Sequence, residues 1–157
     1  MNELQRIVAY LCSNYPHGSE LSKARLTKLV YLADWFSALS DEQTLTNIDW
    51  VFNHYGPYVD EVVDSVTRHK DFSVDHTKTM YGSDKWVISY HGSKREVNRL
   101  DERTKEILDL VIKKTKNMYF NDFIDYVYST YPVRAQNRYT NLNLVELADE
   151  YLEDLAV

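Results

Sequence analysis

The side chains best suited to chemistry in this sequence are five histidines and one cysteine. No two histidines lie four residues apart on one predicted helix: His17, His54, His69, His76 and His91. Cys12 has no second cysteine to pair with, so the spacing gives no zinc ligand set. The four glycines fall in no phosphate-binding pattern. We therefore expect neither a metal nor a cofactor.

Nucleophilic and acid–base catalysis have little support in the sequence. Cys12 follows Leu11 in a predicted helix, where cysteines are usually inert, and no GxSxG elbow occurs. An enzyme remains an alternative, with His54, Tyr55 and Asp60 as acid–base candidates, but no group that would orient them is evident. We expect a protein that is not an enzyme.

The stretch His54-Tyr55-Gly56-Pro57-Tyr58 is the strongest local signal for a binding site. A strand-to-helix turn accounts for Gly56 and for Pro57, which we place at the first position of a helix. It does not account for the flanking aromatic side chains, which are good anchors for a protein partner when rigid elements hold them. The predicted partner-binding residues are His54, Tyr55, Tyr58 and Trp50.

A central helix at about residues 22–38 must position this stretch. The spacing of its apolar residues predicts a helix buried on most sides: Leu26, Leu29, Val30, Leu32, Ala33, Trp35 and Phe36. Ser22 can cap its first turn. For the charged residues inside it, Lys28 and Asp34, we expect a solvated edge or a side-chain pair.

The remaining pattern predicts an α+β fold that is mainly helical, with five or six helices. Apolar residues recur at helical spacing before Pro16 and again after Val59, Asp101 and Phe120. A last helix follows Asn143 and runs from Leu144 to Leu155. Alternation predicts one small antiparallel sheet over residues 48–52, 72–80 and 85–90. We expect residues 133–140 to form a polar loop and residues 1–157 to form a single domain.

Composition and charge indicate the class of partner. The net charge is -6, and the segment from Asn141 onward carries acidic residues and no Lys or Arg, which disfavours nucleic acid and suits a protein partner. No signal peptide and no membrane-spanning run is present, so we expect no membrane association. A lone cysteine fits a reducing compartment, and we expect a cytoplasmic protein.

Several of these motifs, taken in order, resemble one family. Lys28-Leu29-Val30-Tyr31-Leu32-Ala33, then Trp50, then Tyr55-Gly56-Pro57, resembles the Panacea domain, or SocA-like antitoxin domain, whose signature is a KLLYxA-type helix and an aromatic stretch ending in YGP. Val30 replaces the second leucine of that pattern. The similarity extends from Leu4 to Pro132, and its motif residues are Lys28, Leu29, Tyr31, Ala33, Gly56 and Pro57.

The resemblance implies an antitoxin of a toxin–antitoxin system that binds and neutralises a cognate protein toxin by direct contact. One branch of the family acts instead as a proteolytic adaptor, so delivery of a partner to a cytoplasmic AAA+ protease is the alternative. Many members carry a further DNA-binding module, which we do not expect in this chain. The resemblance does not identify the toxin.

Overall fold

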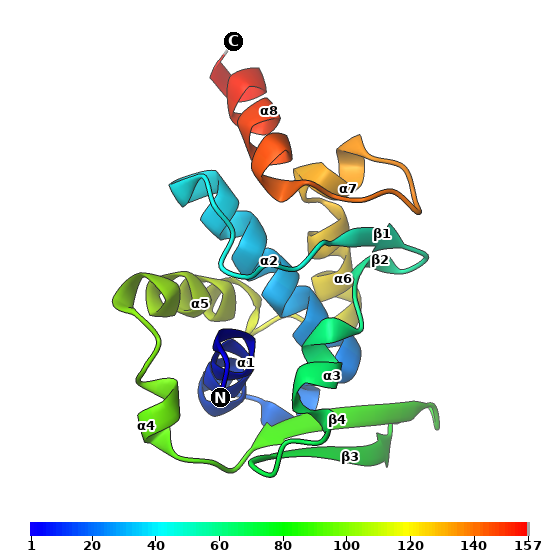
Figure 1. Cartoon of the computed structure of the whole chain (residues 1–157). Helices are drawn as coiled ribbons and strands as arrows, with labels where there is room; N and C mark the ends of the chain where they lie inside the picture. Colours follow the sequence, from blue (N-terminus) through cyan, green and yellow to red (C-terminus); the bar gives the residue numbers. More distant parts are fainter. Residues whose placement is uncertain (157) are drawn as a thin grey trace. The chain divides into compact units, whose positions relative to one another are not determined.

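The computed structural model describes residues 1–156, over which the chain forms eight α-helices, one short 3-10 helix and two β-hairpins (Figure 1). The α+β, mainly helical class is confirmed. The elements run in the order α1 (Glu3–Asn14), η1 (Gly18–Glu20), α2 (Lys23–Asp41), β1 (Val51–Asn53), β2 (Gly56–Tyr58), α3 (Glu61–Thr67), β3 (Phe72–Lys78), β4 (Asp84–Tyr90), α4 (Lys94–Val97), α5 (Glu102–Thr115), α6 (Phe120–Tyr128), α7 (Tyr131–Ala135) and α8 (Leu144–Ala156).

Close backbone contacts divide the chain into two compact units. Unit 1 comprises residues 1–30 and 60–116, and unit 2 comprises residues 31–59 and 117–157. Helix α2 contributes its first two turns to unit 1 and the rest to unit 2. No helix within residues 1–156 is long and apolar enough to cross a membrane.

Unit 1 is built around α1, which contacts α3, α4, α5 and β4. Asn2 and Gln5 form a reciprocal capping box at its start, which satisfies backbone groups that have no partner within the helix. Strands β3 and β4 pair antiparallel from Phe72 opposite Tyr90 to Lys78 opposite Asp84. The Ile88 amide donates to the Leu21 carbonyl at 3.0 Å, which ties this hairpin to the segment before α2.

Unit 2 combines the rest of α2 with the β1–β2 hairpin and helices α6, α7 and α8. Aromatic contacts join these elements, including Tyr31 with Trp50 and Phe52 with Tyr128, both near-perpendicular. The Tyr31 hydroxyl is hydrogen-bonded to that of Thr130 at 2.8 Å. These buried rings with polar groups explain why a tyrosine-rich sequence can form a core with satisfied hydroxyls.

Helix α2 is buried over most of its surface, as its apolar pattern predicts. The Ser22 hydroxyl accepts from the Arg25 amide at 3.1 Å, so the predicted cap is present. Of the two alternatives expected for Lys28 and Asp34, the solvated edge is wrong, because both residues are buried. Both lie in the part of α2 from Arg25 to Trp35, where every residue is buried. The side-chain pair is confirmed for Asp34, which accepts hydrogen bonds from Thr46 and Trp50.

The expected three-stranded sheet is replaced by two separate two-stranded hairpins. Residues 48–50 are not in a strand, and β1 begins at Val51 and pairs with β2. Pro57 accordingly lies in β2 and does not start a helix, since α3 begins at Glu61. Alternation marks which residues face inward but does not reveal the partner strand, which explains the error.

The count of five or six helices was too low because α4 and α7 are short. They have four and five residues, too few to show a helical period. Helix α7 occupies the start of the segment predicted as a loop, and Pro132 lies in its first turn, where the missing amide hydrogen costs nothing.

Candidate functional site

The β1–β2 hairpin places His54 and Tyr55 at its two-residue turn. Gly56 follows with a φ of 102°, a conformation that a residue with a Cβ resists. Pro57 lies opposite Phe52. The backbone N–H and C=O groups of Phe52 are hydrogen-bonded on the side away from Pro57. The Phe52 amide donates to the Thr140 carbonyl at 2.9 Å, and the Phe52 carbonyl accepts from the Tyr139 amide. Proline is tolerated there because Phe52 needs no hydrogen bond from it.

The segment from Arg138 to Leu142 runs along the other edge of β1. The Leu142 amide donates to the Trp50 carbonyl at 2.8 Å, and Val51 forms a bridge with Asn141. Residues about 90 positions apart therefore form one small sheet-like platform within unit 2. Hydrogen bonds to residues 139–142 therefore anchor the base of the hairpin.

Two side chains from that segment support the turn directly. Arg138 Nε donates to the His54 carbonyl at 3.2 Å, and its guanidinium lies 5.6 Å from the centre of the Phe52 ring. The Tyr139 hydroxyl is 3.4 Å from His54 Nδ1. The His54 and Tyr55 rings meet edge-on with centroids 4.6 Å apart. We call His54, Tyr55, Arg138 and Tyr139 the tip cluster.

The tip cluster is exposed. Tyr55 is 75% exposed and Tyr139 is 69% exposed, while His54 and Arg138 are also at the surface. Tyr58, two residues into β2, is half-buried. Tyrosine and arginine dominate the energetics of many protein interfaces, so this arrangement is suited to binding a protein.

The structure places Trp50 apart from this surface. Its side chain is 1% exposed, its ring packs edge-on against Tyr31 at 5.6 Å, and its indole nitrogen donates to Asp34 Oδ2 at 2.8 Å. The ring therefore anchors the segment leading into β1.

Asp34 organises the loop that follows α2. Its buried carboxylate accepts hydrogen bonds from the amides of Leu45 and Thr46 at 2.8 and 2.9 Å, from the Thr46 hydroxyl at 2.5 Å and from Trp50. Burial raises the pKa of Asp34, and the hydrogen bonds act in the opposite direction. One side chain of α2 thus fixes the path of the chain toward the hairpin.

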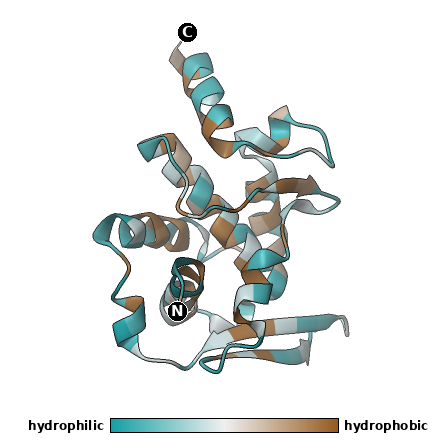
Figure 2. Cartoon of the chain, viewed as in Figure 1, coloured by the Kyte–Doolittle hydropathy of each residue, from teal (hydrophilic) through white to brown (hydrophobic). Residues whose placement is uncertain are grey.

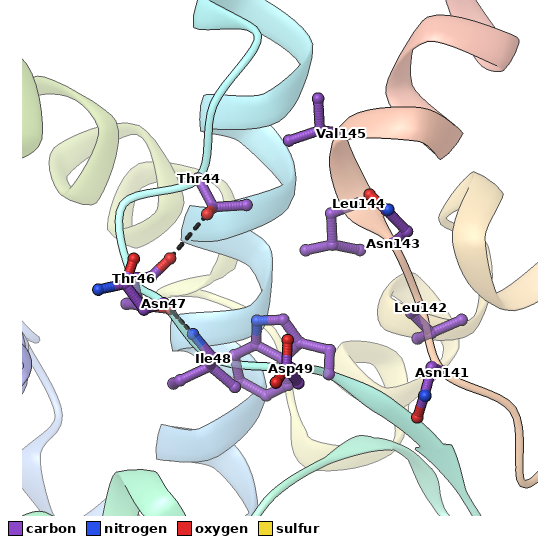
Figure 3. A pocket seen from close by; sticks show the side chains of 11 residues that line it. Thr44, Thr46, Asn47, Ile48, Asp49, Asn141, Leu142, Asn143, Leu144 and Val145 are labelled. Atoms are coloured by element: carbon purple, nitrogen blue, oxygen red, sulfur yellow. Dashed lines mark hydrogen bonds between the residues drawn. The ribbon is translucent and has the colours of Figure 1, made fainter.

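A pocket of about 530 Å³ lies beside this loop in unit 2 (Figure 3). Its walls come from residues 44–50 and from residues 141–145. Asp49 is the one ionisable side chain among the residues that line it, and the others are threonine, asparagine, tryptophan or aliphatic. Such a lining offers hydrogen bonds and apolar contact, and no acid–base pair.

The other predicted chemical groups are Cys12, Asp60 and the candidate metal ligands. Burial raises the pKa of the Cys12 thiol to about 12, and its sulfur lies 3.8 Å from the Ile88 carbonyl oxygen. Asp60 belongs to unit 1, whereas His54 and Tyr55 belong to unit 2. Across residues 1–156, no group of three His, Cys, Asp or Glu side chains is placed to hold a metal ion.

The motif residues of the central helix lie in the interior. Leu29, Tyr31 and Ala33 are buried, as is Lys28, whose pKa burial lowers to about 8. Gly56 and Pro57 are buried beneath the exposed turn. These residues therefore lie in the interior and do not form the surface of the tip cluster.

Sequence reasoning missed Arg138 and Tyr139. Their connection to His54 spans more than 80 residues and depends on the pairing of residues 139–142 with β1. Tyr139 adopts a φ of 68°, which is uncommon for a residue with a side chain. No local pattern in the sequence indicates either feature.

Comparison with known families now identifies the class of protein. The model of the SocA-like antitoxin family, Panacea domain, matches residues 26–132, which include the motif in α2, Trp50 and the hairpin. The chain belongs to this family. The match begins in α2 and leaves out α1 and α8. No curated protein and no solved structure matches the chain significantly.

Proposed function

We propose that this protein is an antitoxin that binds a cognate protein toxin and neutralises it by direct contact. Membership of the SocA-like antitoxin family supports the antitoxin role. Occupying a toxin requires binding and no catalytic step, so the proposed activity is not enzymatic. The contact surface in this proposal contains His54, Tyr55 and Tyr58, joined by Arg138 and Tyr139. Trp50 is left out because its side chain is enclosed.

The exposed and braced tip cluster is the observation that carries the proposal. Its rings project from a hairpin whose base is fixed by hydrogen bonds to residues 139–142. Rings that are already held in place lose little freedom on binding, so more of their contact energy appears as affinity. A turn built only to reverse the chain would need Gly56 but not these side chains.

Co-expression with the protein encoded by the adjacent gene tests the proposal. We expect that protein to arrest growth when expressed alone and the present chain to restore growth. Tyr58→Ala should keep the circular dichroism spectrum of the wild type and weaken binding by about 1–3 kcal/mol, as expected for an interface anchor. Unchanged binding would show that the interface lies elsewhere. Unfolding of the variant would show that Tyr58 is a core residue.

The fate of the bound toxin separates neutralisation from the adaptor alternative. An immunoblot of co-expressing cells should show toxin at an undiminished level under direct neutralisation. Toxin that disappears in a manner dependent on a AAA+ protease would instead establish proteolytic delivery.

A further inference from the structure

Helix α8 is amphipathic along its whole length. The Asn143 side chain accepts from the Glu146 amide at 3.2 Å and caps its first turn. One face carries the apolar residues Leu144, Leu147, Ala148, Tyr151, Leu152 and Leu155 at helical spacing. The opposite face is acidic, and the ribbon alternates between brown and teal in Figure 2.

The surroundings of the apolar face change from one end of α8 to the other. Leu144, Leu147 and Ala148 are buried in unit 2, and α8 contacts α7. Tyr151 packs against Tyr131 with centroids 5.2 Å apart. Beyond it the same face is uncovered. Leu152 is 42% exposed and Leu155 is 64% exposed. We call Leu152 and Leu155 the α8 ridge.

The charge around the ridge is of one sign. Helix α8 contains Glu146, Asp149, Glu150, Glu153 and Asp154 and no Lys or Arg. Unit 2 as a whole has eleven Asp and Glu against two Lys and Arg, a formal net charge of -9. An apolar ridge flanked by carboxylates complements an apolar groove rimmed by Lys and Arg.

We propose that the α8 ridge docks into an apolar, Lys- and Arg-rimmed groove on the toxin. This inference rests on the proposed antitoxin function and adds the chemistry of the partner. It concerns a helix outside residues 26–132, the part of the chain that matches the family model.

The charge of α8 favours a basic protein partner over a ridge-to-ridge dimer, nucleic acid and anionic lipid. Two copies of the chain meeting through their ridges would bring two sets of five α8 carboxylates together, which is repulsive. Nucleic acid and anionic lipid surfaces are negatively charged and would be repelled in the same way. A protein groove with an apolar floor and a basic rim complements both the apolar ridge and the acidic face of α8.

The test uses the purified toxin candidate encoded by the adjacent gene and the full-length chain. Leu152→Ser with Leu155→Ser removes the ridge without altering charge. Leu110→Ser is the matched control, since Leu110 is also 42% exposed on a helix, in unit 1. We expect the double variant to bind at least about tenfold more weakly and the control to bind as the wild type does. Both variants should melt close to the wild-type temperature.

The salt dependence supplies a second measurement. Wild-type binding should weaken as ionic strength rises, because salt screens the contact between carboxylates and basic residues. Asp149→Lys with Glu153→Lys should weaken binding at low salt and reduce that dependence. Binding that is insensitive to both salt and this variant would contradict a basic partner surface.

The outcomes separate this inference from the function on which it rests. If the wild type does not bind the toxin candidate, the proposed function and this inference both fail. If the wild type binds and the ridge variant binds equally well, only this inference fails. A dimer of the free chain that the ridge variant dissociates would assign the ridge to a second copy and would also overturn it.

Discussion

Each unit carries one β-hairpin with a tyrosine near its tip, and the two hairpins differ in how they are held. Tyr55, in unit 2, is 75% exposed at a turn supported by Arg138 and Tyr139. Tyr81, in unit 1, is 89% exposed at the turn between β3 and β4, where the Thr79 amide donates to the Ser83 carbonyl. Exposure alone therefore does not distinguish them. The β3–β4 hairpin is held by a distant segment along strand β4, through the Ile88–Leu21 hydrogen bond, whereas the β1–β2 hairpin is held at the turn itself by Arg138 and Tyr139. This difference favours the β1–β2 hairpin as the binding element.

The two units also differ in charge. Unit 1 has sixteen Lys and Arg against thirteen Asp and Glu, a net charge of +3, while unit 2 has a net charge of -9. Helix α2 follows the same division, since it buries Arg25 and Lys28 in unit 1 and Asp34 in unit 2. The mild overall charge of -6 conceals this separation. The comparison supports our proposal that the partner binds the acidic unit, which carries the hairpin supported at its turn.

The largest expected effect is on the base of that hairpin. Asp34→Ala leaves the amides of Leu45 and Thr46 and the indole of Trp50 without their acceptor. Because buried donors without partners are costly, we expect the free energy of unfolding to fall by about 3–5 kcal/mol. Asp34→Asn should lower the free energy of unfolding by less, since the amide side chain keeps one acceptor oxygen. Equal stability of all three proteins in a denaturant titration would show that the network does not hold the loop.

A core substitution in unit 1 should come next in size. Leu29 is fully buried on α2. Leu29→Ala should lower the free energy of unfolding by roughly 2–5 kcal/mol, the range for a leucine removed from a packed interior. The denaturant midpoint measures this, and an unchanged midpoint would mean that α2 is peripheral to the fold.

A smaller effect should appear when Lys28 is titrated. Its pKa is about 8 in the folded protein, against about 10.4 in an unfolded chain. Between these values the unfolded chain binds more protons, so stability should rise with pH through the window, by about 1–3 kcal/mol in total.

Comparison with Lys28→Met isolates this contribution. The difference in unfolding free energy between wild type and variant should change only above about pH 8. Cys12 titrates in the opposite sense at higher pH, but it is present in both proteins and cancels. A difference that is constant from pH 7 to pH 10 would contradict the lowered pKa of Lys28.

Local patterns predicted the fold class and most helices, because each of those depends on nearby residues. The buried face of α2, the Ser22 cap and the apolar stripe of α8 all follow from spacing within one helix. The pairing of β1 with β2 and with residues 139–142 does not, because strand partners are set by long-range contacts. His54, Tyr55, Tyr58 and Trp50 were predicted as partner-binding residues because they are aromatic and lie at or near a Gly-Pro turn. The role of the first three stays a prediction, while the Trp50 side chain is enclosed.

The enclosed Asp34 shows a second limit of sequence reasoning. A charged residue in a helix usually lies at the surface, so we expected Asp34 at a solvated edge or in a side-chain pair. Its four hydrogen bonds come from residues 11 to 16 positions later, in a loop without a regular pattern. Only the folded path of that loop reveals why a carboxylate is buried.

The most direct test of the account compares the two tip tyrosines in toxin binding. Calorimetric titration of the purified toxin candidate into Tyr55→Ala should show affinity reduced by about 1–3 kcal/mol, while Tyr81→Ala should bind as the wild type does. Both side chains are largely exposed, so both variants should keep the wild-type melting temperature. Loss of binding in Tyr81→Ala with full binding in Tyr55→Ala would place the toxin on unit 1 and contradict the assignment of binding to unit 2.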